Sequence, residues 1–190
     1  MNTSQFPNMH LWRMYLFLLL TIVYTHCSEE AKPEHGSQGS CPQHWVDGTL
    51  TGLGCLLFNS TTAHTWEEAN NYCQRDENAT LVEIWTSLQS DFIASELMLL
   101  EDHEDRRAWW TGGTDIGREG EWYWASSGAS VGDFVWATSN TEPDGGTAYN
   151  CVCLYYGSWE YKGSDIACIT TYYPICQKKV VLCLKDMLNK

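Results

Sequence analysis

The chain has 190 residues, a length typical of one domain with short terminal extensions. Its 24 acidic residues outnumber the 11 basic ones, and the formal net charge of −13 at pH 7 argues against nucleic acids and anionic membrane surfaces as partners. This acidity fits a cation-binding protein or a soluble extracellular protein, and composition does not separate the two.

Residues 1–27 are typical of a secretory signal peptide. Arg13 provides a basic start, Met14 to Tyr24 form an apolar core, and Thr25-His26-Cys27 offers a cleavage site. This core is shorter than the roughly 20 residues that a membrane span needs, although an uncleaved signal anchor is the alternative. No later segment is long and apolar enough to cross a bilayer. We therefore predict a secreted, extracellular protein with no membrane span after signal removal.

The cysteine count and the glycosylation motifs agree with passage through the secretory pathway. The chain has nine cysteines, and without Cys27 the number is even, which favours a disulfide framework over free thiols or zinc. Asn59 and Asn78 each begin an Asn-x-Ser/Thr triplet, so we expect N-glycosylation at both.

Residues 28–40 are polar and rich in Gly, Ser and Glu. They cannot bury enough apolar surface to offset the entropy of ordering, so they predict a disordered linker. Residues 41–58 then predict two strands joined by a glycine-containing turn at residues 48–54. Cys41 and Cys55 would pin this hairpin, and closing a loop of about 15 residues stabilises the fold by roughly 3 kcal/mol on chain-entropy grounds.

Two helices are predicted next. Thr65 and Glu68 form a capping box, and apolar residues recur at helical spacing over residues 66–73, which predicts a helix with one buried face. A second capping signal precedes i,i+4 apolar pairs over residues 86–97. The second helix is expected to end before the charged loop at residues 101–107.

The chain from Trp109 onward is typical of strands. Residues 125–150 show little regular patterning, and a loop this long in a compact domain is usually either disordered or functional. Because this loop contains Trp136, we expect it to be ordered and functional. Strands are predicted at residues 122–124, 151–156, near 159 and at 172–176. Helices early and strands late around one core predict an α+β domain.

Several short motifs also occur in a characteristic order. They are Cys41-Pro42 with Cys55, Tyr72-Cys73, residues 79–84, Trp110-Thr111-Gly112-Gly113, Glu119-Gly120, Trp122-Tyr123-Trp124 and Tyr173-Pro174-Ile175-Cys176. In this order they resemble the long form of the C-type lectin-like domain family, over about residues 41–177. The resemblance implies a C-type lectin-like domain at 41–178, in which two helices flank antiparallel sheets, followed by a tail at 179–190.

The resemblance further implies the disulfides Cys73–Cys176 and Cys151–Cys168. Cys153 and Cys183 are then left over. Either they form a disulfide with each other, or one of them forms a disulfide with a second chain in an oligomer. Their spacing does not decide between these alternatives. A Cys-x-Cys metal site at residues 151 and 153 is disfavoured in an oxidising compartment.

The family's calcium-dependent carbohydrate site lies in the long loop, and its motif is partly present. Glu142 and Asp144 match the family's Glu-Pro-Asn or Gln-Pro-Asp pair, and Asp165 matches the terminal Asp of its Asn-Asp pair. Ser164 stands where Asn is expected, and Pro143 is implied to be cis. The resemblance therefore implies a Ca²⁺ ion, which prefers six to eight oxygen ligands, held by Glu142, Asp144, Ser164 and Asp165.

Other loop residues depart from the family pattern. Tyr149 or Asn150 replaces a later acidic ligand, and Tyr149 could stack on a sugar or simply pack within the loop. Asp115 and Glu119 match a supporting calcium site whose loop partners are absent, so two solvated acids are an equal alternative. Because Glu142 and Asp144 offer only acceptors, the motif does not reveal which sugar is bound.

Two functional hypotheses follow. The first is a secreted, calcium-dependent lectin that binds glycans or glycoproteins, for which a role in innate immunity fits. The second is a calcium-independent domain of the same fold that binds a protein, matrix or mineral partner. An enzyme is disfavoured, because the sequence has no Gly-x-Ser-x-Gly, His-Glu-x-x-His or phosphate-loop motif.

Overall fold

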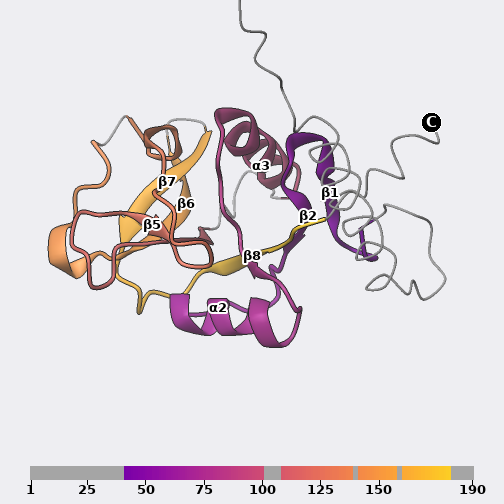
Figure 1. Cartoon of the computed structure of the whole chain (residues 1–190), viewed down its shortest axis with the longest axis horizontal. Helices are drawn as coiled ribbons and strands as arrows, with labels where there is room; N and C mark the ends of the chain where they lie inside the picture. Colours follow the sequence, from indigo (N-terminus) through magenta and orange to yellow (C-terminus); the bar gives the residue numbers. More distant parts are fainter. Residues whose placement is uncertain (1–40, 101–107, 139–140, 158–159, 181–190) are drawn as a thin grey trace, which may run out of the picture. The chain divides into compact units, whose positions relative to one another are not determined.

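The computed structural model describes residues 41–100, 108–138, 141–157 and 160–180 (Figure 1). The predicted signal peptide, the linker at 28–40 and Cys183 lie outside the described residues and stay predictions. Among the described helices, none has the length and hydropathy needed to cross a bilayer.

An eight-stranded sheet forms the frame of the domain, with strand order β1-β2-β8-β4-β6-β7. β3 pairs with β8 and β5 pairs with β4 beside this path. The strands are β1 (Val46–Gly48), β2 (Gly54–Phe58), β3 (Thr80–Leu81), β4 (Trp109–Thr114), β5 (Tyr123–Trp124), β6 (Cys151–Gly157), β7 (Glu160–Ile166) and β8 (Tyr173–Lys178). The early hairpin and the late strands therefore meet at β8, the last strand of the chain.

The pairing of β4 with β8 is parallel, whereas the other strand pairs described are antiparallel. The predicted antiparallel strand direction is therefore wrong for the β4–β8 pair alone among the described strand pairs. The reason is topological: β8 returns from the far side of the long loop and enters the sheet between β2 and β4, antiparallel to β2 and so parallel to β4.

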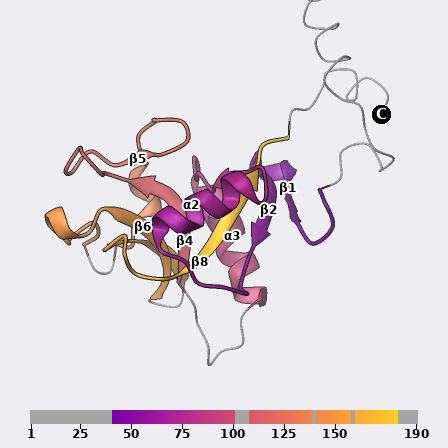
Figure 2. The ribbon, with the colours of Figure 1, turned by 90° about the horizontal axis from the view of Figure 1, so that it is seen from below.

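The two predicted helices are present, as α2 (Trp66–Arg75) and α3 (Ser87–Leu100). The capping box of α2 forms as expected, because the Glu68 carboxylate accepts from the Thr65 amide at 2.9 Å and Thr65 Oγ1 accepts from the Glu68 amide at 3.4 Å. α2 and α3 lie on opposite sides of β8, as Figure 1 and the view from below in Figure 2 agree. Short 3₁₀ turns complete the elements: η1 (Thr49–Thr51), η2 (Asp133–Val135) and η3 (Gly146–Ala148).

Three disulfides staple these elements, and all three match the expected pairs. Cys41–Cys55 closes the N-terminal hairpin. Cys73–Cys176 joins α2 to β8 across a separation of 103 residues, which stabilises the fold by about 4–5 kcal/mol on chain-entropy grounds. Cys151–Cys168 ties the start of β6 to the turn after β7. The long crosslink joins the first described α-helix to the last described strand, and Cys151–Cys168 lies beside the candidate site.

Cys153 on β6 is buried, with 2% of its surface exposed, and it forms no disulfide with another described cysteine. Burial raises the pKa of this thiol to about 12, so it stays protonated at neutral pH. Its proposed partner Cys183 lies outside the described residues, and the pairing of the two stays a prediction.

Tryptophans fill the core where strands and helices meet. Trp109, Trp110 and Trp124 are at most 1% exposed. The indole N–H of Trp110 donates to the carbonyl of His64 at 2.7 Å, so this buried polar group is satisfied. Gly113 allows β4 to approach β6, because an added Cβ there would lie 2.6 Å from a methyl group of Val152.

The motifs for which we predict glycosylation lie in described loops, Asn59 directly after β2 and Asn78 between α2 and β3. Asn78 is exposed, whereas Asn59 is half-buried and its side-chain oxygen accepts from the Thr61 amide at 3.0 Å. Glycosylation at either residue stays a prediction.

One carboxylate is fully buried in the sheet region. Glu83, two residues after the end of β3, accepts hydrogen bonds from the Ser126 hydroxyl and from the Lys179 ammonium, the latter at 3.0 Å. Burial pushes the pKa of Glu83 upward, but these donors outweigh it and the pKa lies below its ordinary value. The charged form is therefore the one that the fold stabilises.

We expect Glu83→Gln to lower the free energy of unfolding at pH 7 by about 1–3 kcal/mol, because hydrogen bonds to a buried charge are lost. The wild-type advantage is complete above the ordinary pKa of 4.5 and disappears as the pH falls below it through the lowered folded pKa. Urea unfolding between pH 3 and pH 7 measures this. The exposed Glu121→Gln is the control, and a constant difference across the range would contradict the assignment.

Candidate calcium and carbohydrate site

The candidate site forms where the long loop between β5 and β6 crosses β7. β7 is the last strand of the sheet, so one edge of its backbone is free to bind the loop. Antiparallel pairing with β6 places Asp165 opposite Val152 and Ser164 opposite Cys153. Ser164 and Asp165 thus lie on a strand rather than in a loop, and the sheet fixes their positions.

Four hydrogen bonds anchor the loop to this strand. The two carboxylate oxygens of Asp165 accept from the amides of Asp144 and Gly145, each at 2.9 Å. The Ser164 hydroxyl donates to Glu142 Oε1 at 2.9 Å, and the Asp165 amide donates to Glu142 Oε2 at 3.3 Å. The Glu142–Pro143 peptide is cis, as the resemblance implied.

These contacts bring three carboxylates together. Glu142, Asp144 and Asp165 each offer an oxygen within 4.8 Å of the others, a spacing that one cation can bridge. Asp165 is 3% exposed, Glu142 is half-buried and Asp144 is exposed. The three acids that the motif singled out therefore converge, although 21 residues separate Asp144 from Asp165.

The cluster changes the titration of Glu142. Burial raises the pKa of this carboxyl, and the hydrogen bond to Asp165 and the charge of Asp144 raise it further, to about 7. The Ser164 hydroxyl and the Asp165 amide act in the opposite direction but do not compensate. Without a cation, the Glu142 carboxyl is therefore about half protonated near pH 7.

The donor set fits a hard divalent cation. Each carboxylate oxygen has two lone pairs, so Asp165 and Glu142 can keep their hydrogen bonds and still contribute a ligand. Ca²⁺ takes six to eight oxygens at flexible geometry, and water or sugar hydroxyls can complete a set begun by three carboxylates and Ser164. A divalent charge would also offset the burial and the neighbouring carboxylates that raise the pKa of Glu142.

Tyr149 lies farther along the same loop, at the end of η3. Its ring packs against Gly145, since a Cβ added to that glycine would lie 1.9 Å from the ring. About 38% of Tyr149 is exposed. Packing thus accounts for part of this side chain, and its contact with a sugar stays a prediction.

The supporting site at Asp115 and Glu119 is not assembled among the described residues. Asp115 is 2% exposed, and its Oδ2 accepts from the Gly120 amide at 2.9 Å, which closes a turn. Its Oδ1 is buried without a hydrogen-bond partner. Glu119 is exposed, and neither acid belongs to a cluster of three within the described ranges.

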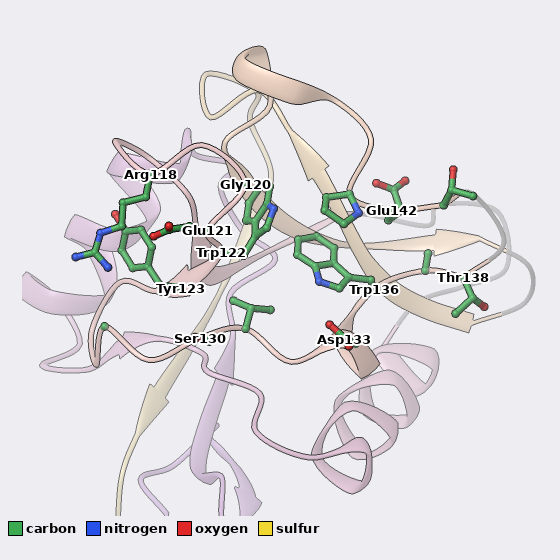
Figure 3. A pocket seen from close by; sticks show the side chains of 15 residues that line it. Arg118, Gly120, Glu121, Trp122, Tyr123, Ser130, Asp133, Trp136, Thr138 and Glu142 are labelled. Atoms are coloured by element: carbon green, nitrogen blue, oxygen red, sulfur yellow. The ribbon is translucent and has the colours of Figure 1, made fainter.

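A groove that the motif did not reveal begins at Glu142 and Pro143 (Figure 3). It has a volume of about 740 Å³ and extends past Trp136 and Trp122 to Arg118. The only sequence signal was an excess of aromatic residues near the loop, which is more often a sign of core packing.

Comparisons with known proteins identify the family of this chain. A family model described as "Lectin C-type domain" matches residues 62–178. Mouse lithostathine-1 is 30% identical over 168 residues, covering 87% of this chain and 96% of that protein. Human C-type lectin domain family 17, member A, is 28% identical over 141 residues, covering 74% of this chain but 32% of that protein.

Solved structures show the same fold. The mouse scavenger receptor C-type lectin carbohydrate-recognition domain is 26% identical, with a TM-score of 0.61, and the match covers 75% of this chain and 99% of that one. The chain therefore belongs to the C-type lectin domain family. This confirms the predicted family and the α+β C-type lectin-like fold.

The anchoring role of Asp165 can be tested in the protein without calcium. We expect Asp165→Asn to speed hydrogen exchange at the Asp144 and Gly145 amides by about tenfold or more, because an amide side chain cannot accept both hydrogen bonds. Mass spectrometry after deuterium labelling measures the rates.

Asp144→Asn is the matched control, since it changes an acid of the same loop and leaves both acceptors on Asp165. Equal exchange rates in Asp165→Asn and the wild type would show that the loop does not depend on this carboxylate.

Proposed function

We propose that this chain is a secreted protein that binds glycans or glycoproteins through a calcium ion held by Glu142, Asp144, Ser164 and Asp165. The observation that carries the proposal is the convergence of three carboxylates from the long loop and β7 within 4.8 Å. The disulfide framework and the predicted signal peptide support secretion.

The residues have distinct roles in this proposal. Asp165 fixes the loop and adds a ligand, while Glu142 and Asp144 face outward enough to reach a sugar as well as the ion. Bound calcium supplies a positive centre to which two neighbouring sugar hydroxyls can bind. Glu142 and Asp144 are acceptors when ionised, so both hydroxyls donate hydrogen bonds to the protein.

Calcium binding is expected to raise the melting temperature, because a ligand that binds only the folded state stabilises it. At ten times the dissociation constant the gain is about 1.4 kcal/mol, or roughly 3–6 °C for a domain of this size. Asp144→Ala should keep the calcium-free melting temperature and lose the shift. Its exposed side chain makes no hydrogen bond to the described residues, whereas its amide still binds Asp165.

Differential scanning fluorimetry with millimolar calcium and with EDTA measures both effects. Asp76→Ala, which removes an exposed acid at the end of α2, is the control and should keep the shift. A wild-type melting curve that calcium leaves unchanged would remove the basis for a working calcium site.

Glycan recognition is tested on an array of mammalian and microbial glycans, read in calcium and in EDTA. We expect binding in calcium that EDTA reduces at least tenfold, and that Asp144→Ala reduces equally. Binding that EDTA does not affect, or binding only to a protein, matrix or mineral surface, would instead favour the calcium-independent alternative.

A further inference from the structure

The groove beside the three carboxylates has an aromatic floor. Trp122 and Trp136 pack edge to face, with ring centroids 4.9 Å apart and planes at 72°. Figure 3 shows both rings in the middle of the groove, between Arg118 at one end and Glu142 at the other. Trp122 is half-buried, so part of its ring is open to a ligand. Aromatic surface with a few polar groups is typical of small-ligand sites, which measure about 300–1,000 Å³.

The floor is rigidly connected to the carboxylate cluster through β7. Trp136 forms a β-bridge with Gly163, and the Ala137 amide donates to the Gly163 carbonyl at 2.9 Å. The next two residues of the strand, Ser164 and Asp165, hold the loop tip. Gly163 is required at this contact, because an added Cβ would lie 2.9 Å from the carbonyl oxygen of Val135. Three consecutive residues of one strand thus position both the groove and the cluster.

The charges in the groove indicate which ligands it accepts. Glu121 and Asp133 are exposed, and Glu142 lies at one end. The one cation in the lining, Arg118, lies over the ring of Tyr123 at 4.9 Å. The excess of carboxylates repels anionic ligands such as sialylated or sulfated glycans, and it leaves acceptors for the hydroxyls of an uncharged one.

We infer that this groove binds the second and third residues of an uncharged oligosaccharide whose terminal residue binds at the carboxylate cluster. The inference rests on the proposed function, because the cluster sets where the terminal sugar lies. Sugar rings have C–H faces that pack on aromatic rings and hydroxyl groups that donate to carboxylates. The two tryptophans and the carboxylates of the groove offer both kinds of contact. The groove therefore determines glycan length, whereas the cluster determines which terminal sugar is accepted.

Isothermal titration calorimetry in calcium tests this with three probe pairs: methyl mannoside and mannotriose, methyl N-acetylglucosaminide and chitotriose, and methyl galactoside and galactotriose. For the sugar that binds, we expect the trisaccharide to bind at least tenfold more tightly than the methyl glycoside. Trp122→Ala should reduce this advantage to less than twofold while the affinity for the methyl glycoside stays within twofold.

Two further variants make the result specific. Ser130→Trp adds a bulky side chain at an exposed residue of the groove, and it should abolish the trisaccharide advantage even if Trp122→Ala does not fold. Trp85→Ala removes a tryptophan that is 41% exposed and does not line the groove, so it should keep the advantage.

The outcomes separate the two proposals. A methyl glycoside that binds in calcium, with a trisaccharide that binds no more tightly or with an advantage that Ser130→Trp leaves intact, would overturn the groove inference alone. No binding of any probe and no calcium shift in the melting temperature would overturn the proposed function and the inference with it. Equal trisaccharide affinity in EDTA would also overturn the inference, because the terminal residue would not need the ion.

Discussion

The carboxylate of Asp165 is the contact on which the candidate site depends. It accepts two loop amides on an edge strand, so a long segment without regular structure is held at one point. A hydrogen bond from a backbone amide to a buried carboxylate is among the stronger neutral-to-charged contacts in proteins. Glu142 completes the attachment through Ser164 and the Asp165 amide. The position of Asp144 in the site follows from the Asp165 carboxylate, and that of Glu142 follows from its hydrogen-bond partners on the same strand.

The sheet and the disulfides make that attachment possible. β7 is held by β6, and β6 is held by β4, while Cys151–Cys168 closes the end of the β6–β7 pair nearest the site. Cys73–Cys176 ties α2 to β8, which lies between β2 and β4 in the sheet. The candidate oxygen ligands are gathered by one strand edge and by the loop that binds to it. Burial, together with the neighbouring carboxylates, raises the pKa of Glu142.

Features whose causes are local could be predicted from the sequence. The capping box of Thr65 and Glu68 and the hairpin crosslink Cys41–Cys55 both depend on residues close in the chain, and both form as expected. The three acids of the site were found because their motif offsets match a family, not because 142 and 165 can be placed together by periodicity. The burial of Glu83 beside Lys179, 96 residues away, had no such signal.

The sequence by itself therefore determined the fold class, the family, the helices and the identity of the acids, since these follow from local spacing and motif order. Only the tertiary structure decided that β8 runs parallel to β4, that Ser164 and Asp165 lie on an edge strand, and that Trp122 and Trp136 line a groove. The physical reason is that each of these depends on which distant segments meet. A residue pattern records how a side chain suits burial, but it does not record which strand edge or ring that side chain will touch.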